Sequence, residues 1–280
     1  MRKEMKITII TVSYNAESTI EQTINSVLMQ TYKNIEYVII DGGSKDKTID
    51  IIKKYNDKLH YWVSEKDYGI YNAYNKGLLV ATGDYVQFLN ADDSLINAYT
   101  IENMVKSLKK NNYPDIFCGN AIIVDEKYAL EKPLKFLYSA KELEFGKSIC
   151  FPGVFIKRDI LNEYNFNEKY KIVSDFELTL KLYLNNKRFI FSNIPIVFFG
   201  NGGISSTNDE LRLIEHYDVL KKYLGENSAN DFLKKEKNIF YKIKNKVKDK
   251  IKERSYFIKI ILGWKKHKCK NKFCRWCNNK

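Results

Sequence analysis

The sequence has no long uninterrupted apolar segment. A helix that crosses a bilayer needs about 20 consecutive apolar residues, whereas the stretch YFIKIILGW near the C-terminus is short and contains Lys259. The N-terminal stretch MRKEMKITIITVSYN begins with basic residues, but its apolar run includes Thr and Ser and no small-residue cleavage site follows it. We therefore expect neither a transmembrane helix nor a signal peptide, and we expect a cytoplasmic protein.

Cysteines are few and odd in number, at five. Cys118 and Cys150 lie in apolar, strand-like runs, which indicates buried thiols in a reducing compartment rather than a disulfide framework. Near the C-terminus a C-x-x-C pair invites a zinc site, but the other spacings do not match a common four-ligand set. We favour ordinary or lipid-modified thiols there, and the sequence assigns no role to this group: His267, Cys269, Cys274 and Cys277.

The positive charge is concentrated at one end of the chain. The formal net charge is +13, but residues 234–280 hold 18 Lys and Arg against three Asp and Glu, which leaves about −2 for the first 233 residues. Beyond about Gly225 the chain is rich in Lys, and apolar residues recur every four positions at Ile239, Ile243, Val247 and Ile251. We predict a folded domain over residues 1–225 and a basic amphipathic helical tail over residues 226–280.

Strand-like and helix-like patterns alternate through the first hundred residues. The expected strands are KITIITVSYN, IEYVIID, HYWVSE and DYVQFLN, and the intervening segments have helical periodicity. This alternation predicts an α/β fold with a mostly parallel sheet and helices on both faces. In such folds the functional crevice lies at the carboxyl ends of the strands, and the second half of the chain is less regular.

Polar residues follow each of these strands. The segments are TVSYNAE, DGGSKD, SEKDYG and NADD, and the chain lacks both G-x-G-x-x-G after the first strand and G-x-x-x-x-G-K-[ST] anywhere. A nucleotide bound there needs another way to hold its diphosphate. A divalent cation at NADD would supply it, because Mg²⁺ and Mn²⁺ take oxygen ligands and bridge phosphates. The simpler interpretation is that Asp92, Asp93 and Ser94 cap a following helix.

These segments, together with SDFEL farther along, resemble in the same order the bacterial family-2 glycosyltransferases of GT-A fold, a Rossmann-like fold of nucleotide-diphospho-sugar transferases. The similarity spans roughly residues 5–205 and is greatest to the group that builds exopolysaccharide, capsule or surface glycans. Several motifs in one order are more specific than any one of them. In that family the donor sits over the first four strands, a D-x-D element holds the metal, and an Asp at the start of a later helix is the base.

Carried over by position, the resemblance implies a metal ligand at Asp92 and a catalytic base at Asp175. Asp41 would bond to the nucleotide base, usually uracil, while Asp67 and Asn75 would face ribose, diphosphate or sugar. The full set of donor-binding residues that the resemblance implies is Thr11, Ser13, Asn15, Asp41, Asp67, Asn75, Asn90, Ala91 and Asp93.

Two positions depart from the family pattern. Asn90 replaces the first acid of D-x-D, which lowers the charge of the site but retains an amide oxygen. Related sequences often place a His before the strand resembling GVFIKR, where this chain has Phe151. Simpler interpretations also remain: DGGSKD as a tight turn, Asp175 as a helix N-terminal acid, and the tyrosines spaced by three as packing residues, namely Tyr68, Tyr71 and Tyr74.

The resemblance implies an inverting glycosyltransferase that uses a UDP-sugar and Mg²⁺ or Mn²⁺ and acts on a glycan acceptor. From the basic tail we expect the enzyme to lie at the anionic inner face of the cytoplasmic membrane, where the acceptor would be lipid-linked. One alternative is a nucleotidyltransferase acting on sugar phosphates, but SYNAEST lacks the Gly and Lys of a phosphate loop. Another is a nucleic-acid-binding protein, yet the crevice is acidic and the positive charge is confined to the tail. The sugar, the acceptor, the linkage and the oligomeric state do not follow from the sequence.

Overall fold

The computed structural model describes residues 4–125, 130–134, 139–200, 208–236 and 265–266. Most of the predicted tail therefore lies outside the described residues, including its apolar positions from Ile239 to Ile251 and the cysteines from Cys269 to Cys277. No helix among the described residues is long and apolar enough to cross a bilayer.

The first half of the sheet is parallel. Its strands lie side by side in the order β4-β1-β2-β3 and have these bounds: β1 (Ile7–Ser13), β2 (Ile35–Asp41), β3 (Tyr61–Ser64) and β4 (Tyr85–Phe88). In this register Ser13 pairs with Asp41, and Asp41 pairs with Ser64. The polar residues that end three different strands are therefore brought to one edge of the sheet.

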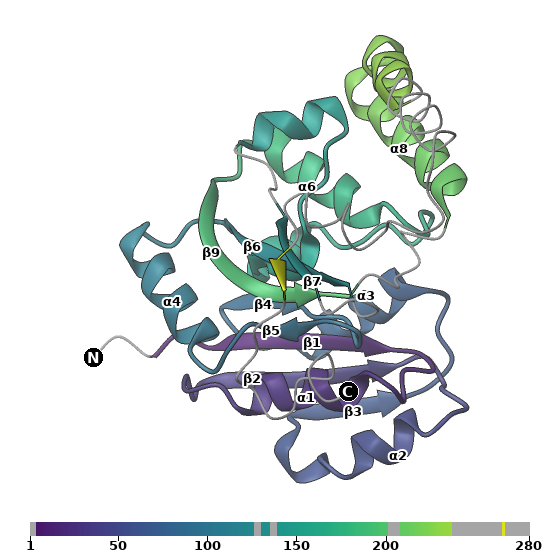
Figure 1. The fold of residues 1–280 in the computed structure, drawn as a ribbon. Helices are drawn as coiled ribbons and strands as arrows, with labels where there is room; N and C mark the ends of the chain where they lie inside the picture. Colours follow the sequence, from purple (N-terminus) through teal and green to yellow (C-terminus); the bar gives the residue numbers. More distant parts are fainter. Residues whose placement is uncertain (1–3, 126–129, 135–138, 201–207, 237–264, 267–280) are drawn as a thin grey trace.

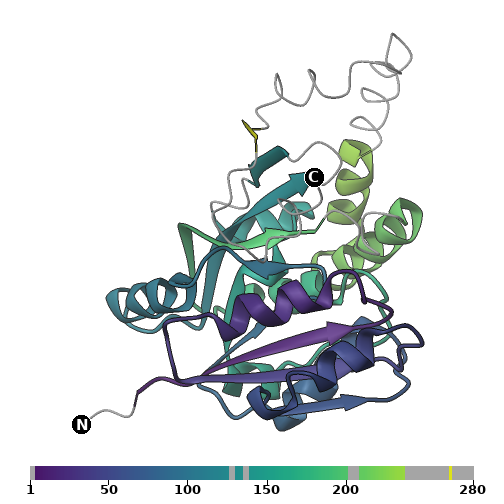
Figure 2. The same ribbon diagram turned by 60° about the horizontal axis from the view of Figure 1, so that its bottom comes forward.

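Helices cover both faces of this half, because its central strands are apolar on both sides. Ile7 and Ile9 face a core with α1 (Ile20–Leu28) and α4 (Thr100–Lys110), whereas Ile10 faces a second core. Figure 2 shows α1, in dark purple, lying across the strands. The remaining helices of the first half are α2 (Thr48–Lys53), the 3₁₀ helix η1 (Asn56–Lys58) and α3 (Ile70–Val80).

The second half of the sheet is largely antiparallel. β8 pairs antiparallel with β4 and β6, β7 pairs antiparallel with β6 and β10, and β5 pairs antiparallel with β9, whereas β6 and β9 are parallel. The predicted α/β sheet with helices on both faces is confirmed, and its parallel pairing is concentrated in the first four strands. The strands of this half are β5 (Ser94–Leu95), β6 (Ile116–Asp125), β7 (Leu130–Leu134), β8 (Val154–Lys157), β9 (Phe189–Phe199) and β10 (Lys265–Lys266).

The helices of the second half lie together on one side of the sheet. Figure 1 shows α6 and α8 at the top of the view, on the far side of the strands from α2. Their residues join the core that contains Ile10, including Leu178 and Leu182 of α6 and Val219 of α8. The elements are η2 (Ala140–Phe145), η3 (Phe151–Gly153), α5 (Arg158–Glu163), α6 (Ser174–Leu184) and α8 (Asp209–Leu224).

The chain does not leave the folded body at the predicted boundary. Gly225 ends α8 with a φ of +85°, a conformation that costs glycine little, and residues 226–236 are again helical. Ala229 and Phe232 are buried in the same core as α6, and a Cβ at Gly146 would clash with the Phe232 ring. The first part of the predicted tail therefore packs on the body. The tail is also not helical throughout, because Lys265–Lys266 form β10 at the edge of the sheet, paired with β7.

Candidate active site

Asp41 joins the ends of three parallel strands. Its side chain is fully buried, and its two oxygens accept hydrogen bonds from the Ser13 hydroxyl at 2.9 Å, the Ser44 hydroxyl at 2.6 Å and the Ser64 hydroxyl at 2.6 Å. The backbone N–H groups of Gly43 and Ser44 add two more, at 3.1 and 2.9 Å. Asp41 thus fixes the ends of these strands relative to one another. Its predicted contact with a nucleobase stays a prediction.

The other predicted residues of β1 and its loop are also held by the chain itself. Thr11 is fully buried and lies 3.1 Å from the Tyr37 hydroxyl, inside the core. Asn15 has a φ of +49°; its backbone N–H donates to the Ser44 hydroxyl, and its side-chain oxygen accepts from the Lys45 N–H at 2.9 Å. These bonds shape the turn after β2, so their support for a donor is indirect.

Asp67 lies at the rim of this turn. Its carboxylate accepts a hydrogen bond from the Gly69 N–H at 3.0 Å and packs so closely on Gly42 that a Cβ there would clash with it. The first glycine of DGGSKD, Gly42, is therefore required by the approach of Asp67. A side chain at position 42 would displace this carboxylate.

Asn75 connects α3 with the segment that leads to α6. Its side chain accepts from the Phe166 N–H and donates to the Phe166 carbonyl, both at 3.0 Å, and it also donates to Glu168 at 2.8 Å. Such reciprocal bonding positions the later segment against the first half of the sheet. The predicted contact of Asn75 with the donor stays a prediction.

The NADD segment is anchored by three different elements. The Asn90 side-chain oxygen accepts from the Tyr74 hydroxyl of α3 at 2.5 Å, and the Thr23 hydroxyl of α1 lies 2.9 Å from the Ala91 carbonyl oxygen. The buried Asp93 carboxylate accepts from the Gly200 N–H, beyond β9, at 3.0 Å. Asp92 is the partly exposed acid of the segment.

The helix-cap interpretation of this segment is wrong. Ser94 and Leu95 form β5, and α4 begins only at Thr100. Asp92 and Asp93 therefore do not cap α4. A Cβ at Gly200 would come within 2.9 Å of the Asp92 carboxylate, so glycine there makes room for this acid.

The donor set of NADD fits a cation that a ligand completes rather than a resident metal centre. Across the described ranges no three His, Cys, Asp or Glu side chains gather as metal ligands. Asp92 offers one partly exposed carboxylate, and the Asn90 oxygen already accepts from Tyr74. Mg²⁺ is commonly bound through one or two carboxylates together with substrate phosphates and water. Asp92 is therefore suited to hold Mg²⁺ or Mn²⁺ together with a diphosphate.

Asp175 lies in the first turn of α6, facing α3. Its Oδ1 atom accepts from the Tyr71 hydroxyl at 2.9 Å and from the Phe176 N–H at 2.8 Å. Burial raises the pKa of Asp175 to about 6, although these hydrogen bonds oppose the shift. A carboxylate with a pKa near the working pH is suited to take a proton during a reaction.

Tyr74 lies between Asp175 and the NADD segment. Burial raises the pKa of Tyr74 well above its usual value, and the negative charges of Asp175, Asp93 and Asp92 add to the rise. The charges of the predicted base and of both NADD acids therefore all act on the Tyr74 hydroxyl. The predicted packing role is confirmed for Tyr71 and Tyr74, which are 5% and 3% exposed, whereas Tyr68 is 75% exposed.

Neighbouring positions are poorly placed to replace Asp175. Glu177 is 2% exposed and accepts from Lys222 at 2.9 Å and from the Tyr223 hydroxyl at 2.8 Å.

Phe151, at the position where related sequences carry His, is buried and its ring centroid lies 5.7 Å from that of Phe88. Phe151 is thus a core residue and offers no hydrogen bond to a phosphate.

Sequence reasoning missed Glu215. It lies on α8, is 7% exposed, and accepts hydrogen bonds from three consecutive backbone N–H groups just before α6. Its spacing is a signal that could have found it, because Glu215 lies four residues from Leu211 and from Val219, on the helix face that packs on the core. A carboxylate on such a face needs partners, and here the backbone supplies them.

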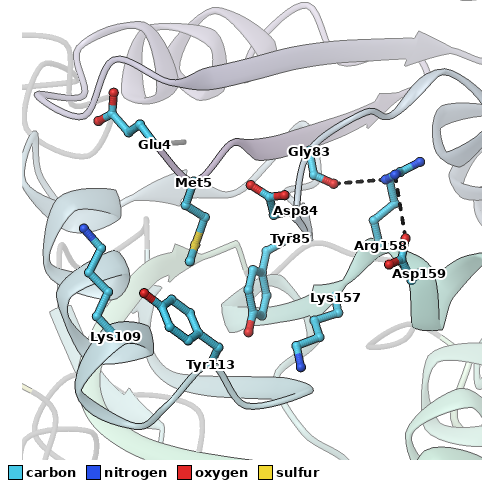
Figure 3. A pocket seen from close by; sticks show the side chains of 10 residues that line it. All are labelled: Glu4, Met5, Gly83, Asp84, Tyr85, Lys109, Tyr113, Lys157, Arg158 and Asp159. Carbon is cyan, nitrogen blue, oxygen red and sulfur yellow. Dashed lines mark hydrogen bonds and ion pairs between the residues drawn. The ribbon is translucent and has the colours of Figure 1, made fainter. Parts of the chain in front are cut away.

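A separate cleft of about 860 Å³ lies at the opposite edge of the sheet, at the amino ends of β1 and β4 (Figure 3). Its lining mixes both charge signs, and Lys157 is already paired with Asp115 at 2.8 Å. None of the predicted site residues lines it. Ser13, Asp41 and the NADD segment lie instead at the carboxyl ends of the strands, where an α/β fold favours its functional crevice.

Residues 8–206 match the family model described as Glycosyl transferase family 2. The chain belongs to this family. It is 29% identical to an uncharacterized glycosyltransferase of Rickettsia typhi, over 76% of this chain and 70% of that protein. It is 25% identical to the PGL/p-HBAD biosynthesis glycosyltransferase of Mycobacterium bovis, over 71% of this chain and 78% of that protein.

Solved structures support the same fold. S. aureus TarS in complex with UDP-GlcNAc superposes with a TM-score of 0.63 at 22% identity, covering 82% of this chain and 70% of that one. The mannosyltransferase PcManGT of Pyrobaculum calidifontis, in complex with GDP-Man and Mn²⁺, gives 0.59 at 16% identity, covering 94% and 81%. The GT-A fold expected from the motifs is confirmed, and the family membership argues against the nucleotidyltransferase and nucleic-acid-binding alternatives.

Proposed function

We propose that this glycosyltransferase inverts the configuration of a sugar that it transfers from a UDP-sugar, with Mg²⁺ or Mn²⁺, to a glycan acceptor in the synthesis of a bacterial surface polysaccharide. The observation that carries the proposal is Asp175, a partly exposed carboxylate with a pKa near 6 that shares Tyr74 as a neighbour with Asp92 and Asp93. The UDP-GlcNAc complex of TarS and the GDP-Man and Mn²⁺ complex of PcManGT support the donor class and the cation.

Asp175 acts as the general base. Both of its hydrogen bonds described above reach Oδ1, so Oδ2 can accept the proton of the acceptor hydroxyl. The acceptor oxygen then forms a bond to the anomeric carbon while the bond from that carbon to the diphosphate oxygen breaks, and the electron pair leaves with UDP. Attack from the face opposite the leaving group inverts the anomeric centre.

The NADD segment holds the diphosphate side of the donor. Asp92 would be the protein ligand of the cation, and Asp93 and Tyr74 fix the segment from behind. The cation, when bound, neutralises the charge that develops on the departing diphosphate. Asp41 and the serines around it hold the strand ends on which the nucleoside would lie.

Metal-dependent donor binding tests this assignment. We expect UDP with Mn²⁺ to raise the melting temperature of the protein, as ligands that bind only the native state do, and UDP with EDTA to raise it much less. Asp92→Ala should abolish the metal-dependent part, whereas Asp50→Ala, an exposed aspartate on α2, should keep it. Full metal-dependent stabilisation and turnover in folded Asp92→Ala would remove the cation from this site.

We also propose that the basic segment beyond residue 236 holds the enzyme at the anionic inner face of the cytoplasmic membrane, near a lipid-linked acceptor. Each Lys or Arg near an anionic surface contributes about 1 kcal/mol of attraction. Since residues 226–236 pack on the body, the truncation ends after Glu236; it also removes β10 from the sheet edge, so an unchanged melting temperature is required of the truncated chain. The full chain should float with phosphatidylglycerol vesicles and not with phosphatidylcholine vesicles, and the truncated chain with neither. Equal flotation of both chains with anionic vesicles would refute the membrane role.

A further inference from the structure

The segment from Lys171 to Val173 connects the proposed base to a helix outside the family domain. Its three backbone N–H groups all donate to the Glu215 carboxylate: Lys171 to Oε1 at 2.8 Å, and Ile172 and Val173 to Oε2 at 2.9 and 3.2 Å. Glu215 lies on α8, beyond the residues 8–206 that match the family model. One carboxylate of α8 therefore fixes the backbone immediately before the first turn of α6.

Tyr71 of α3 holds the same segment from the other side. Its hydroxyl oxygen lies 2.6 Å from the Ile172 carbonyl oxygen and 2.9 Å from Asp175 Oδ1. A tyrosine hydroxyl has one hydrogen, so it can donate fully to only one of these acceptors at a time. The hydroxyl can serve both only if its hydrogen bonding changes with the protonation state of Asp175.

The two arrangements follow from counting hydrogens. When Asp175 is ionised, Tyr71 donates its hydrogen to the carboxylate, as charge-assisted hydrogen bonds are the stronger ones. When Asp175 has taken up a proton on Oδ2, its Oδ1 atom carries no charge and is a weaker acceptor, so the tyrosine hydrogen can go to the Ile172 carbonyl oxygen. The Tyr71 hydroxyl thus has an acceptor in both protonation states of Asp175 without any heavy atom having to move.

We propose that Tyr71 and Glu215 are positioning residues for Asp175: Glu215 fixes the backbone before α6, and Tyr71 holds Oδ1 of the ionised carboxylate and contacts the Ile172 carbonyl oxygen of the same backbone. The inference rests on the proposed role of Asp175 as the general base. It adds that α8 is a part of the catalytic unit, although it lies outside the matched family domain.

The two residues act in opposite directions on the proton affinity of Asp175. The hydrogen bond from Tyr71 lowers the pKa of Asp175, whereas the negative charge of Glu215 raises it. Other titratable groups near Asp175 are Tyr74 on the same helix as Tyr71, the thiol of Cys150, whose pKa burial raises, and the acids Asp92 and Asp93, which act on the same Tyr74. Neither substitution removes any of these groups, so the contributions of Tyr71 and Glu215 can be separated.

The test compares Tyr71→Phe and Glu215→Gln with matched controls, Tyr99→Phe and Glu210→Gln, which alter exposed side chains at or near the start of α4 and α8. Sugar transfer from the UDP-sugar is measured against pH. We expect kcat to fall about 10-fold or more in both variants, because a displacement of about 1 Å at a reacting group can cost 10²-fold. The KM for the donor should change little.

The pH profile distinguishes positioning from a general loss of structure. The acidic limb of kcat should move to higher pH in Tyr71→Phe and to lower pH in Glu215→Gln, while both controls keep the wild-type limb. A merely loosened fold would shift both variants in the same direction or in neither. Shifts in the same direction, or unchanged kcat and limb in either folded variant, would overturn the inference.

Two further variants keep the outcome interpretable. If Glu215→Gln does not fold, Glu215→Asp retains the charge but shortens the side chain by one methylene, so kcat should fall while the acidic limb stays in place. Asp175→Asn separates this inference from the proposed function: retained transfer there would remove the base itself. Lost transfer in Asp175→Asn together with wild-type behaviour of Tyr71→Phe and of the Glu215 variants would refute only the positioning role.

Discussion

Glu36 and Asp175 are two shielded carboxylates on opposite edges of the molecule, and their proton affinities differ widely. Glu36 lies near the amino end of β2, is 1% exposed, and accepts from Lys6, Thr8 and Thr82 at 2.5 to 3.0 Å. Burial alone would raise the pKa of Glu36, but these hydrogen bonds outweigh it and lower the pKa to about 2. For Asp175 burial prevails, and the pKa is about 6.

The difference lies in the number of donors and in the presence of a cation. Glu36 accepts from two hydroxyls, one backbone N–H and the ammonium group of Lys6. Asp175 accepts from one hydroxyl and one backbone N–H. A carboxylate with many donors favours its charged form and stabilises the fold, whereas one with few donors keeps its affinity for a proton. The same kind of group thus serves structure at one edge and, in the proposed function, accepts a proton at the other.

The largest expected effect comes from removing the proton acceptor at the carboxyl edge. Asp175→Asn keeps the size of the side chain but cannot take a proton, so we expect transfer to fall by about 10² or more. Binding of UDP with Mn²⁺ should be retained in a thermal-shift assay, because the donor contacts lie elsewhere. Near-normal turnover in this variant would show that Asp175 is not the general base and that its pKa, which is raised whereas that of Glu36 is lowered, plays no part in the reaction.

The corresponding change at the amino edge should affect stability instead. Glu36→Gln removes the charge that Lys6 and the threonines satisfy, so we expect the free energy of unfolding at pH 7 to fall by about 2 kcal/mol. In the wild type this contribution is present above pH 4.5 and is lost as the pH falls toward 2, because the pKa of Glu36 is about 2 in the folded state. Urea titrations at pH 7 and pH 3 measure it, and transfer per folded molecule should not change.

Equal stability of Glu36→Gln and wild type at both pH values would contradict the structural role. Glu21→Gln is a suitable control, because this glutamate is exposed on α1 and its carboxylate accepts one exposed hydrogen bond, from the Tyr55 hydroxyl at 3.1 Å. Its substitution should change the free energy of unfolding by no more than about 0.5 kcal/mol, as for most surface changes.

The smallest expected effect is on the free energy of unfolding, which the ionised Asp175 carboxylate lowers. Because the pKa of Asp175 is raised in the folded state, its ionisation opposes folding as the pH rises from about 4 to above 6. After allowance for solvent screening of this partly exposed group, we expect Asp175→Asn to be more stable than wild type by about 1 kcal/mol at pH 8. The advantage should vanish below about pH 4, and urea titrations at both pH values check this. A constant difference between the two proteins would point to altered packing instead.

The sequence by itself determined the parts of this protein that depend on local patterns. The alternating segments predicted the parallel half of the sheet, the motif order predicted the family, and Cys118 and Cys150 are buried as free thiols, as expected. Polar residues that follow successive parallel strands must share one edge of the sheet, so the location of Ser13, Asp41 and NADD could be predicted from the order of the strands.

Only the tertiary structure decided which of these residues are free to act. Asp41 and Asn75 form hydrogen bonds within the chain. Asp92 does not cap a helix, because β5 follows the NADD segment. Tyr71 and Asp175 are 104 residues apart, and Glu215 reaches Ile172 across 43 residues. Periodicity reports which face of an element is buried, but such contacts depend on strand pairing and helix packing between distant segments. The balance of burial and donors that gives Asp175 its proton affinity exists only once those segments meet.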